Sequence, residues 1–98
     1  MSPGPDAQDL FRRIRSWNLS SWRRADRIGI TRAALSALAE MASSHDGVQR
    51  PEVPDAGIHA LADQLEVLTA DAIEAGGPTD DVDAVLSGLA RDLGLAKA

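Results

Sequence analysis

Apolar residues recur every three or four positions along one stretch of the chain, from residue 54 to residue 77. This spacing places them on one face of a helix with polar residues opposite, so it predicts an amphipathic α-helix. The apolar face consists of Ile58, Leu61, Leu65, Leu68, Ala72 and Ala75. Pro54 and Asp55 suit a helix start, and Gly76 and Gly77 suit a helix end. We therefore predict a long central helix, around which the other elements pack.

The same periodicity recurs in other segments of the chain. It predicts helices over residues 7–17, 22–28, 31–42 and 80–93. Gly29, whose backbone freedom suits a turn, separates the second of these from the third. No stretch alternates apolar and polar residues in the way that a half-buried strand does. The predicted fold class is all-α: a small helical bundle of three main helices plus one or two short helices, with a long central helix.

The chain is long enough for one domain. We expect residues 1–5, which hold prolines and a glycine, to be a disordered tail, and residues 6–95 to form a single helical domain. Within it, the basic N-terminal helices span residues 6–42. A polar linker with a glycine and a proline occupies residues 43–53, and the acidic C-terminal helices span residues 54–95.

Charge is segregated between the two halves of the chain. Residues 1–50 hold eight basic and five acidic residues, a net charge of +3, whereas residues 51–98 hold two basic and ten acidic residues, a net charge of −8. One interpretation is that the basic N-terminal helices lie beside the chain's own acidic helices. The other is that the basic residues face an anionic partner.

Seven arginines carry most of the positive charge of the first half. They are Arg12, Arg13, Arg15, Arg23, Arg24, Arg27 and Arg32. Such a cluster can serve a nucleic-acid backbone, an anionic membrane surface or an acidic protein surface. The sequence does not choose among these anionic partners, so the arginines are candidate binding residues without an assigned ligand.

Residues 22–38 (WRRADRIGITRAALSAL) resemble the helix-turn-helix of many DNA-binding proteins. Ala25 stands four residues before Gly29, as at the close helix contact and the turn of that motif. Arg24 departs from the pattern, which usually has an apolar residue there. The resemblance implies a recognition helix whose candidate contacts are Thr31, Arg32 and Ser36. These side chains are a poor set for bidentate contacts to bases.

Three apolar residues are candidates for a protein interface. Trp17 completes an apolar face and is expected in the core, whereas Trp22 lies at a break and is the expected exposed anchor. Val67 falls opposite Ile58 on the central helix, and Ile73 flanks its main apolar face. Because a helix with apolar residues beyond one face usually has several neighbours, we predict contact near Val67 with the last helix or a second subunit.

The sequence contains no motif that specifies catalysis, a metal or a cofactor. It has no cysteine, so it has no thiolate nucleophile, disulfide or cysteine zinc site. His59 and Asp63 have the spacing of paired ligands, but no second histidine lies on that helix, so we expect no metal. A secretory signal pattern and a membrane-spanning apolar run are also missing, which favours a cytoplasmic protein.

These observations lead to two hypotheses about function. The first is a non-catalytic protein-interaction module that binds a protein partner or itself as a homodimer, because a small helical chain with segregated charge mainly offers surfaces. The alternative is a helix-turn-helix DNA-binding regulator that uses residues 22–41. No cofactor is expected in either case, and the chain is not expected to be an enzyme.

Overall fold

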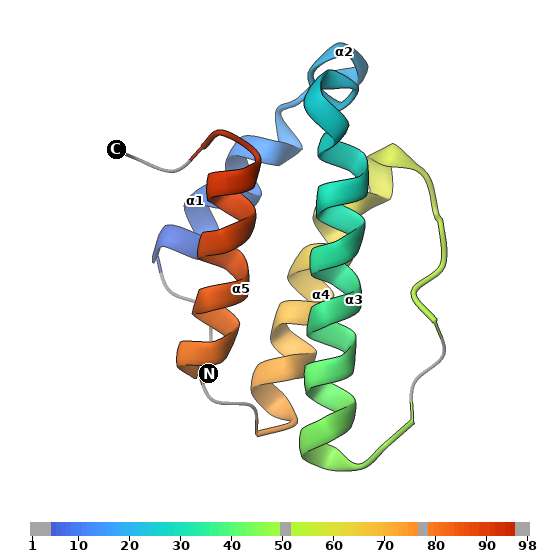
Figure 1. The fold of residues 1–98 in the computed structure, drawn as a ribbon, viewed down its shortest axis with the longest axis vertical. Coiled ribbons are helices and arrows are strands. Elements are labelled where there is room, and N and C mark those ends of the chain that lie inside the picture. Colours follow the sequence, from blue (N-terminus) through green and yellow to red (C-terminus); the bar gives the residue numbers. More distant parts are fainter. Residues whose placement is uncertain (1–4, 50–51, 77–78, 96–98) are drawn as a thin grey trace.

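The computed structural model describes residues 5–49, 52–76 and 79–95. These residues form five α-helices, two short 3-10 helices and no strand, so the predicted all-α bundle is confirmed (Figure 1). The elements are α1 (Pro5–Arg15), α2 (Leu19–Trp22), η1 (Arg24–Asp26), α3 (Arg27–Asp46), η2 (Ile58–Ala60), α4 (Leu61–Glu74) and α5 (Thr79–Asp92). Of the tail expected at residues 1–5, Pro5 begins α1 and the rest lies outside the described residues.

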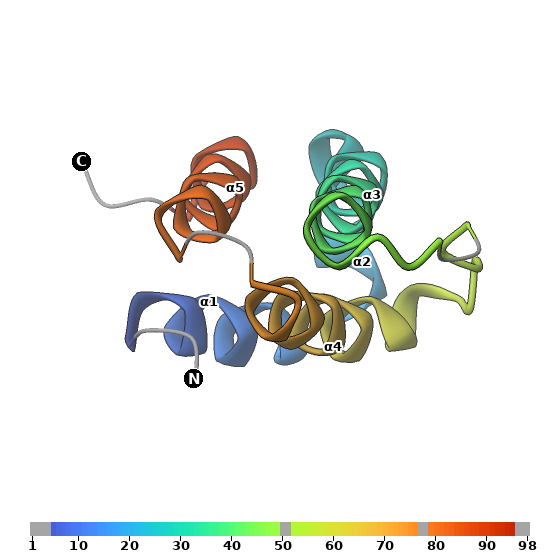
Figure 2. The same ribbon diagram turned by 90° about the horizontal axis from the view of Figure 1, so that it is seen from below.

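The main helices lie in two layers. Figure 2 shows α3 and α5 side by side in one layer and α1 and α4 in the other. The most extensive contact between elements joins α3 to α4 across the layers. The Cα atoms extend over 38 × 29 × 17 Å, and the shortest extent suits two helix layers whose axes are about 8–10 Å apart.

Each main helix buries one face in a shared core. The largest fully buried side chains are Phe11, Ile14, Leu35, Leu38, Leu61, Leu65, Leu93, Val82, Thr31 and Thr69. On α4 the buried Leu61, Leu65 and Ala72 belong to the predicted apolar face. Two further residues of that face, Leu68 on α4 and Ile58 in η2, are partly buried against the same core. The apolar periodicity therefore identifies the side of α4 that faces the rest of the bundle.

The start of α4 differs from the sequence prediction. The helix begins at Leu61, after η2, and not at Asp55. The Asp55 carboxylate accepts a hydrogen bond from the backbone N–H of Gly57 at 3.1 Å, and Gly57 has a φ of 90°. This local turn competes with a helical start, as is common for aspartate side chains. Residues 52–57 consequently form a non-helical segment beside the bundle.

The turn predicted at Gly29 is wrong, because Gly29 lies inside α3. The chain instead breaks at Ala25 and Asp26, whose φ angles of 47° and 55° are left-handed. The Asp26 carboxylate lies over Gly29: a β-carbon on that residue would come within 2.7 Å of Asp26 Oδ1. The glycine therefore permits a close approach within a helix. At its other end α3 continues to Asp46, so the expected linker begins at Gly47, beyond Ser43.

Two fully buried threonines differ in how their hydroxyls are satisfied. Thr69 Oγ1 donates a hydrogen bond to the Leu65 carbonyl at 2.7 Å, whereas Thr31 Oγ1 has no hydrogen-bond partner among the described residues. Thr31→Val should therefore raise the free energy of unfolding by about 1 kcal/mol, because it removes an unsatisfied buried hydroxyl at nearly constant shape. Urea denaturation measures the change.

Thr69→Val is the matched control for that prediction. It removes a satisfied hydroxyl and should lower the free energy of unfolding by about 0–1 kcal/mol. A Thr31→Val variant that is less stable than Thr69→Val would contradict the idea that the Thr31 hydroxyl is unsatisfied in the core.

Candidate functional site

Three of the predicted arginines pair with the chain's own acidic residues. Arg15 on α1 reaches across to α4, where its guanidinium lies 2.6 Å from Asp63 and 2.5 Å from Glu66. Arg12 pairs with Asp9 on its own helix. Arg32 lies 3.6 Å from Asp55 and donates a hydrogen bond to the Val53 carbonyl at 3.5 Å. The contacts of Arg15 and Arg32 support the interpretation that part of the positive charge lies beside the acidic half of the same chain.

The contact between Arg15 and α4 is electrostatic and exposed to solvent. Hydrogen bonds to Asp63 and then Glu66 raise the pKa of the Arg15 guanidinium above its usual value. A raised pKa of a base contributes stability that is present below the unfolded-state pKa and is lost only as pH rises through the folded-state pKa. Since both values are strongly alkaline, Arg15 stays charged at neutral pH, and its ion pairs to α4 persist there.

Two more arginines have contacts within the fold. Arg13 donates a hydrogen bond from Nη1 to the Leu95 carbonyl at 3.2 Å, which ties α1 to the residues that follow α5. Arg27 donates to the Ser21 carbonyl at 3.0 Å, and its guanidinium carbon lies 4.2 Å from the ring centre of Trp17. This cation–π geometry holds the start of α3 against Trp17 in the connection between α1 and α2. Both side chains are therefore engaged in holding the bundle together.

Arg23 and Arg24 are predicted binding residues that are exposed and have no side-chain partner among the described residues. Both lie at the turn between α2 and α3, near Leu19, whose side chain is 44% exposed. We call Leu19, Arg23 and Arg24 the basic end. The left-handed backbone at Ala25 and Asp26 closes this turn, and such residues persist only where surrounding contacts impose them.

A groove lies between α3, α4 and the segment of residues 52–54, and we call it the α3–α4 groove. It is a hollow of about 450 Å³. Its apolar lining consists of Ala39, Val53, Pro54, Ala60, Val67 and Leu68. Its polar lining consists of Glu52, Asp63, Gln64 and Asp71. Val67, at 57% exposed, is one of the most exposed large apolar side chains in the described part of the chain.

The segment that borders the groove is held in place from both helices. Arg32 on α3 donates to the Val53 carbonyl, and Gln64 Nε2 on α4 donates to the Pro54 carbonyl at 2.9 Å. The Val53 side chain is also partly buried against the core. Because hydrogen bonds and packing fix the segment, the groove exists in the free protein and needs no partner to form it.

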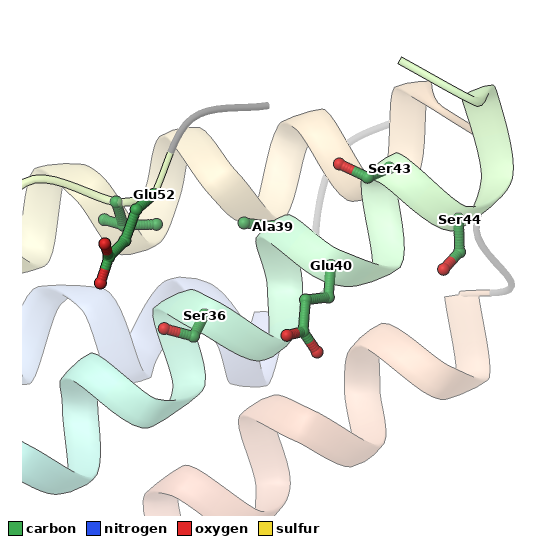
Figure 3. A pocket seen from close by; sticks show the side chains of 7 residues that line it. Ser36, Ala39, Glu40, Ser43, Ser44 and Glu52 are labelled. Carbon is green, nitrogen blue, oxygen red and sulfur yellow. The ribbon is translucent and has the colours of Figure 1, made fainter. Parts of the chain in front are cut away.

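A second hollow of about 530 Å³ adjoins the groove along α3 and shares Ala39, Glu52 and Val53 with it. Figure 3 shows Ser36, Glu40, Ser43 and Ser44 extending from α3, with Glu52 on the neighbouring segment. The predicted recognition residue Ser36 therefore lies among carboxylates. This environment repels phosphate.

The two hollows together form an acidic surface. No basic residue occurs among the described residues that line either hollow. Asp63 is paired with Arg15, whereas Glu40, Glu52 and Asp71 make no ion pair within the described ranges. An apolar floor with unpaired carboxylates at its rim favours a ligand that is both apolar and positively charged.

The predicted exposure of Trp22 is wrong, whereas Trp17 packs against the core as predicted. Trp22 is buried at 3% exposed, so it is not the exposed anchor that we expected, and Trp17 is only partly buried. The two rings meet edge to face with centroids 5.0 Å apart. The break after Trp17 folds the chain back, which places Trp22 inside the bundle, and Trp17 covers it from outside.

Other predicted site residues also take different positions. Thr31 is fully buried, so it is not available for contact with DNA. Ile73 is partly buried against the core. Val67 is not covered by the last helix as one alternative had it, since most of its side chain is exposed and it borders the α3–α4 groove. Contact between Val67 and a second subunit remains a prediction.

Sequence reasoning missed most of the groove. Of its lining, only Val67 was a candidate interface residue, because a valine on the polar side of a helix is recognisable from periodicity alone. Val53 carries a weaker signal, as an apolar residue inside an otherwise polar linker. Glu52, Leu68 and Asp71 become one site only when the 52–54 segment folds back between α3 and α4.

Comparison with known proteins gives the site no relative from which a role could be transferred. No family profile, no curated protein and no solved structure matches the chain. No helix in the described ranges is both long and apolar enough to cross a membrane. Among the same residues, no group of three or more histidine, aspartate or glutamate side chains is placed to hold a metal ion.

Proposed function

We propose that the protein is a non-catalytic protein-interaction module whose α3–α4 groove binds a basic segment of a protein partner. The observation that carries this proposal is the exposed Val67 in an apolar lining beside Glu52 and Asp71, whose carboxylates make no ion pair with any described residue. Apolar contact supplies affinity in such a groove, and the surrounding charges favour a partner of opposite sign.

The size of the groove sets the kind of partner that fits. A hollow of about 450 Å³ accommodates one or two large side chains, and it is open to solvent along α3 and α4. This suits an amphipathic helix that inserts one apolar side chain and places arginines or lysines next to the rim, the common mode in which helices bind to grooves. The nearby carboxylate of Glu40 extends the acidic surface beyond the groove itself.

The DNA-binding alternative has less support. A helix-turn-helix reader would expose the side chains that follow its turn, but Thr31 is buried and Arg32 contacts the 52–55 segment. Arg23 and Arg24 alone would give few phosphate contacts. Sequence-independent binding of nucleic acid gains its affinity from many such contacts. Protein binding accounts for both the exposed arginines and the exposed carboxylates that have no ion pair with a described residue, whereas DNA binding accounts for the arginines alone.

A substitution at Val67 tests the proposed function. Val67→Lys should weaken binding of a helical peptide with one leucine anchor and flanking arginines at least about 10-fold, because it removes the apolar contact and introduces a like charge. The free energy of unfolding should change by no more than about 0.5 kcal/mol, since Val67 is exposed. Titration followed by NMR measures affinity and identifies the residues affected.

Ala84→Lys on α5 is the matched control, because Ala84 is also an exposed helical residue and lies outside the lining of the groove. It adds the same charge and should leave peptide affinity within about two-fold of the parent. The proposal is overturned if no peptide of this class perturbs the signals of Val67, Leu68 and Ala39, or if Val67→Lys binds as tightly as Ala84→Lys.

A further inference from the structure

We infer that the occupant of the α3–α4 groove is the basic end of a second copy of this chain, with Leu19 as the apolar anchor and Arg23 and Arg24 against the acidic rim. The inference rests on the proposed function and names the partner for that same site. It follows from groups that have no ion pair with any described residue: two arginines at one end of the bundle, and acidic residues along one side.

The two surfaces match in chemical character. The basic end has a leucine that is 44% exposed, next to two exposed guanidinium groups. The groove has an apolar floor that includes Val67 and Leu68, next to the carboxylates of Glu52 and Asp71. A leucine with flanking arginines is the ligand type that such a lining favours. Opposite charges on the two surfaces also orient the encounter. They favour contact between a basic end and a groove over contact between two like-charged surfaces.

One copy does not satisfy both surfaces by itself. The basic end precedes Arg27 at the start of α3, whereas the groove lies beside Ala39 on the same helix. At 1.5 Å of rise per residue, these two points on α3 are about 18 Å apart along a continuous helix. Since a helix does not fold back on itself, the basic end that fills the groove must come from another molecule.

The resulting contact joins two different surfaces, so it is heterologous. Each molecule that docks its basic end into a neighbour still has its own groove free. Unless the geometry closes a ring, assembly therefore continues beyond a dimer. We expect the weight-average mass in sedimentation experiments to rise steadily with protein concentration, and to fall toward that of the monomer at high salt because surface charge pairs are screened.

The deciding experiment mixes two variants that each lack one of the two surfaces. The first, Leu19→Ser with Arg23→Ser and Arg24→Ser, keeps the groove. The second, Glu52→Gln with Val67→Ser and Asp71→Asn, keeps the basic end. Each variant alone should be monomeric. An equimolar mixture should form a one-to-one complex that does not grow, because one intact groove meets one intact basic end.

Circular dichroism and the melting temperature of each variant first establish that it folds. If the first triple variant does not fold, the exposed Arg23→Ser/Arg24→Ser pair takes its place. The inference is overturned if the parent stays monomeric at high concentration and low salt, if either variant associates like the parent, or if the mixture stays monomeric. Binding of short duplex DNA by a monomeric parent would likewise overturn it, by assigning the basic end to nucleic acid.

The two proposals fail in different ways. If the parent does not self-associate but a leucine–arginine peptide still binds and Val67→Lys weakens that binding, the groove is an interaction site for another protein and only the self-association is wrong. If no such peptide binds either, the proposed function is wrong as well. A mixture that forms the one-to-one complex supports both.

Discussion

Leu65→Ala should lower the free energy of unfolding by about 3–5 kcal/mol, the largest effect that we expect from a single aliphatic truncation in this chain. Leu65 lies in the second turn of α4 and has no exposed surface. Its helix contacts α3, α1 and α5, so a cavity at this position removes contacts from several elements at once. The loss comprises both the transfer free energy of the deleted atoms and the cavity that remains.

Urea denaturation of the parent and the variant measures this change, with Val67→Ala as the control on the same helix. The control deletes exposed methyl groups and should alter the free energy of unfolding by no more than about 0.5 kcal/mol. Since domains of this size are stable by only about 5–15 kcal/mol, Leu65→Ala should also lower the melting temperature markedly. A loss below about 1 kcal/mol would show that α4 is not packed as described.

The helical class and the core faces were predictable because they depend on local periodicity. Leu35, Leu38, Leu61 and Leu65 follow the spacing of three and four and are all buried. A residue on the apolar face of an amphipathic helix in a small bundle has few other places to go, since every such face needs a partner. For these residues the sequence pattern and the tertiary structure agree.

The turn between α2 and α3 was not predictable from the same rules. Glycine is the residue most compatible with a turn, so the sequence favours a break at Gly29. The structure instead places left-handed backbone at Ala25 and Asp26, which is unfavourable for residues with a β-carbon. The hydrogen bond from Arg27 to the Ser21 carbonyl spans this turn, and the burial of Trp22 adds a tertiary contact next to it; such contacts outweigh the local preference.

The groove was unpredictable for a different reason. Its lining comes from α3, α4 and the segment between them, and only the return of that segment along α3 brings Glu52 near Asp71. The charge pattern indicated that basic and acidic halves would meet, and Arg15 does pair with Asp63. It gave no means of telling which arginines are used within the chain and which, like Arg24, remain exposed.

The two tryptophans give the second large prediction. Trp22→Ala should lower the free energy of unfolding by about 3–5 kcal/mol, because Trp22 is buried at 3% exposed and its removal leaves a large cavity. Trp17→Ala should cost about 1–2 kcal/mol, since that ring is only partly buried and contributes mainly the edge-to-face contact and the cation–π contact with Arg27. Equilibrium unfolding of both variants gives the difference directly.

Fluorescence of the same two variants tests the assignment independently of stability. In Trp17→Ala the remaining Trp22 should emit at shorter wavelength and resist quenching by iodide, as a ring in an apolar interior does. If the Trp22→Ala variant stays folded, its remaining Trp17 should emit at longer wavelength and be quenched readily. If the variant unfolds, the unfolding itself shows that loss of Trp22 is the more destabilising change. Equal losses of stability, or a Trp22 that iodide quenches readily in the folded Trp17→Ala variant, would contradict the burial of Trp22 and restore it as an exposed anchor.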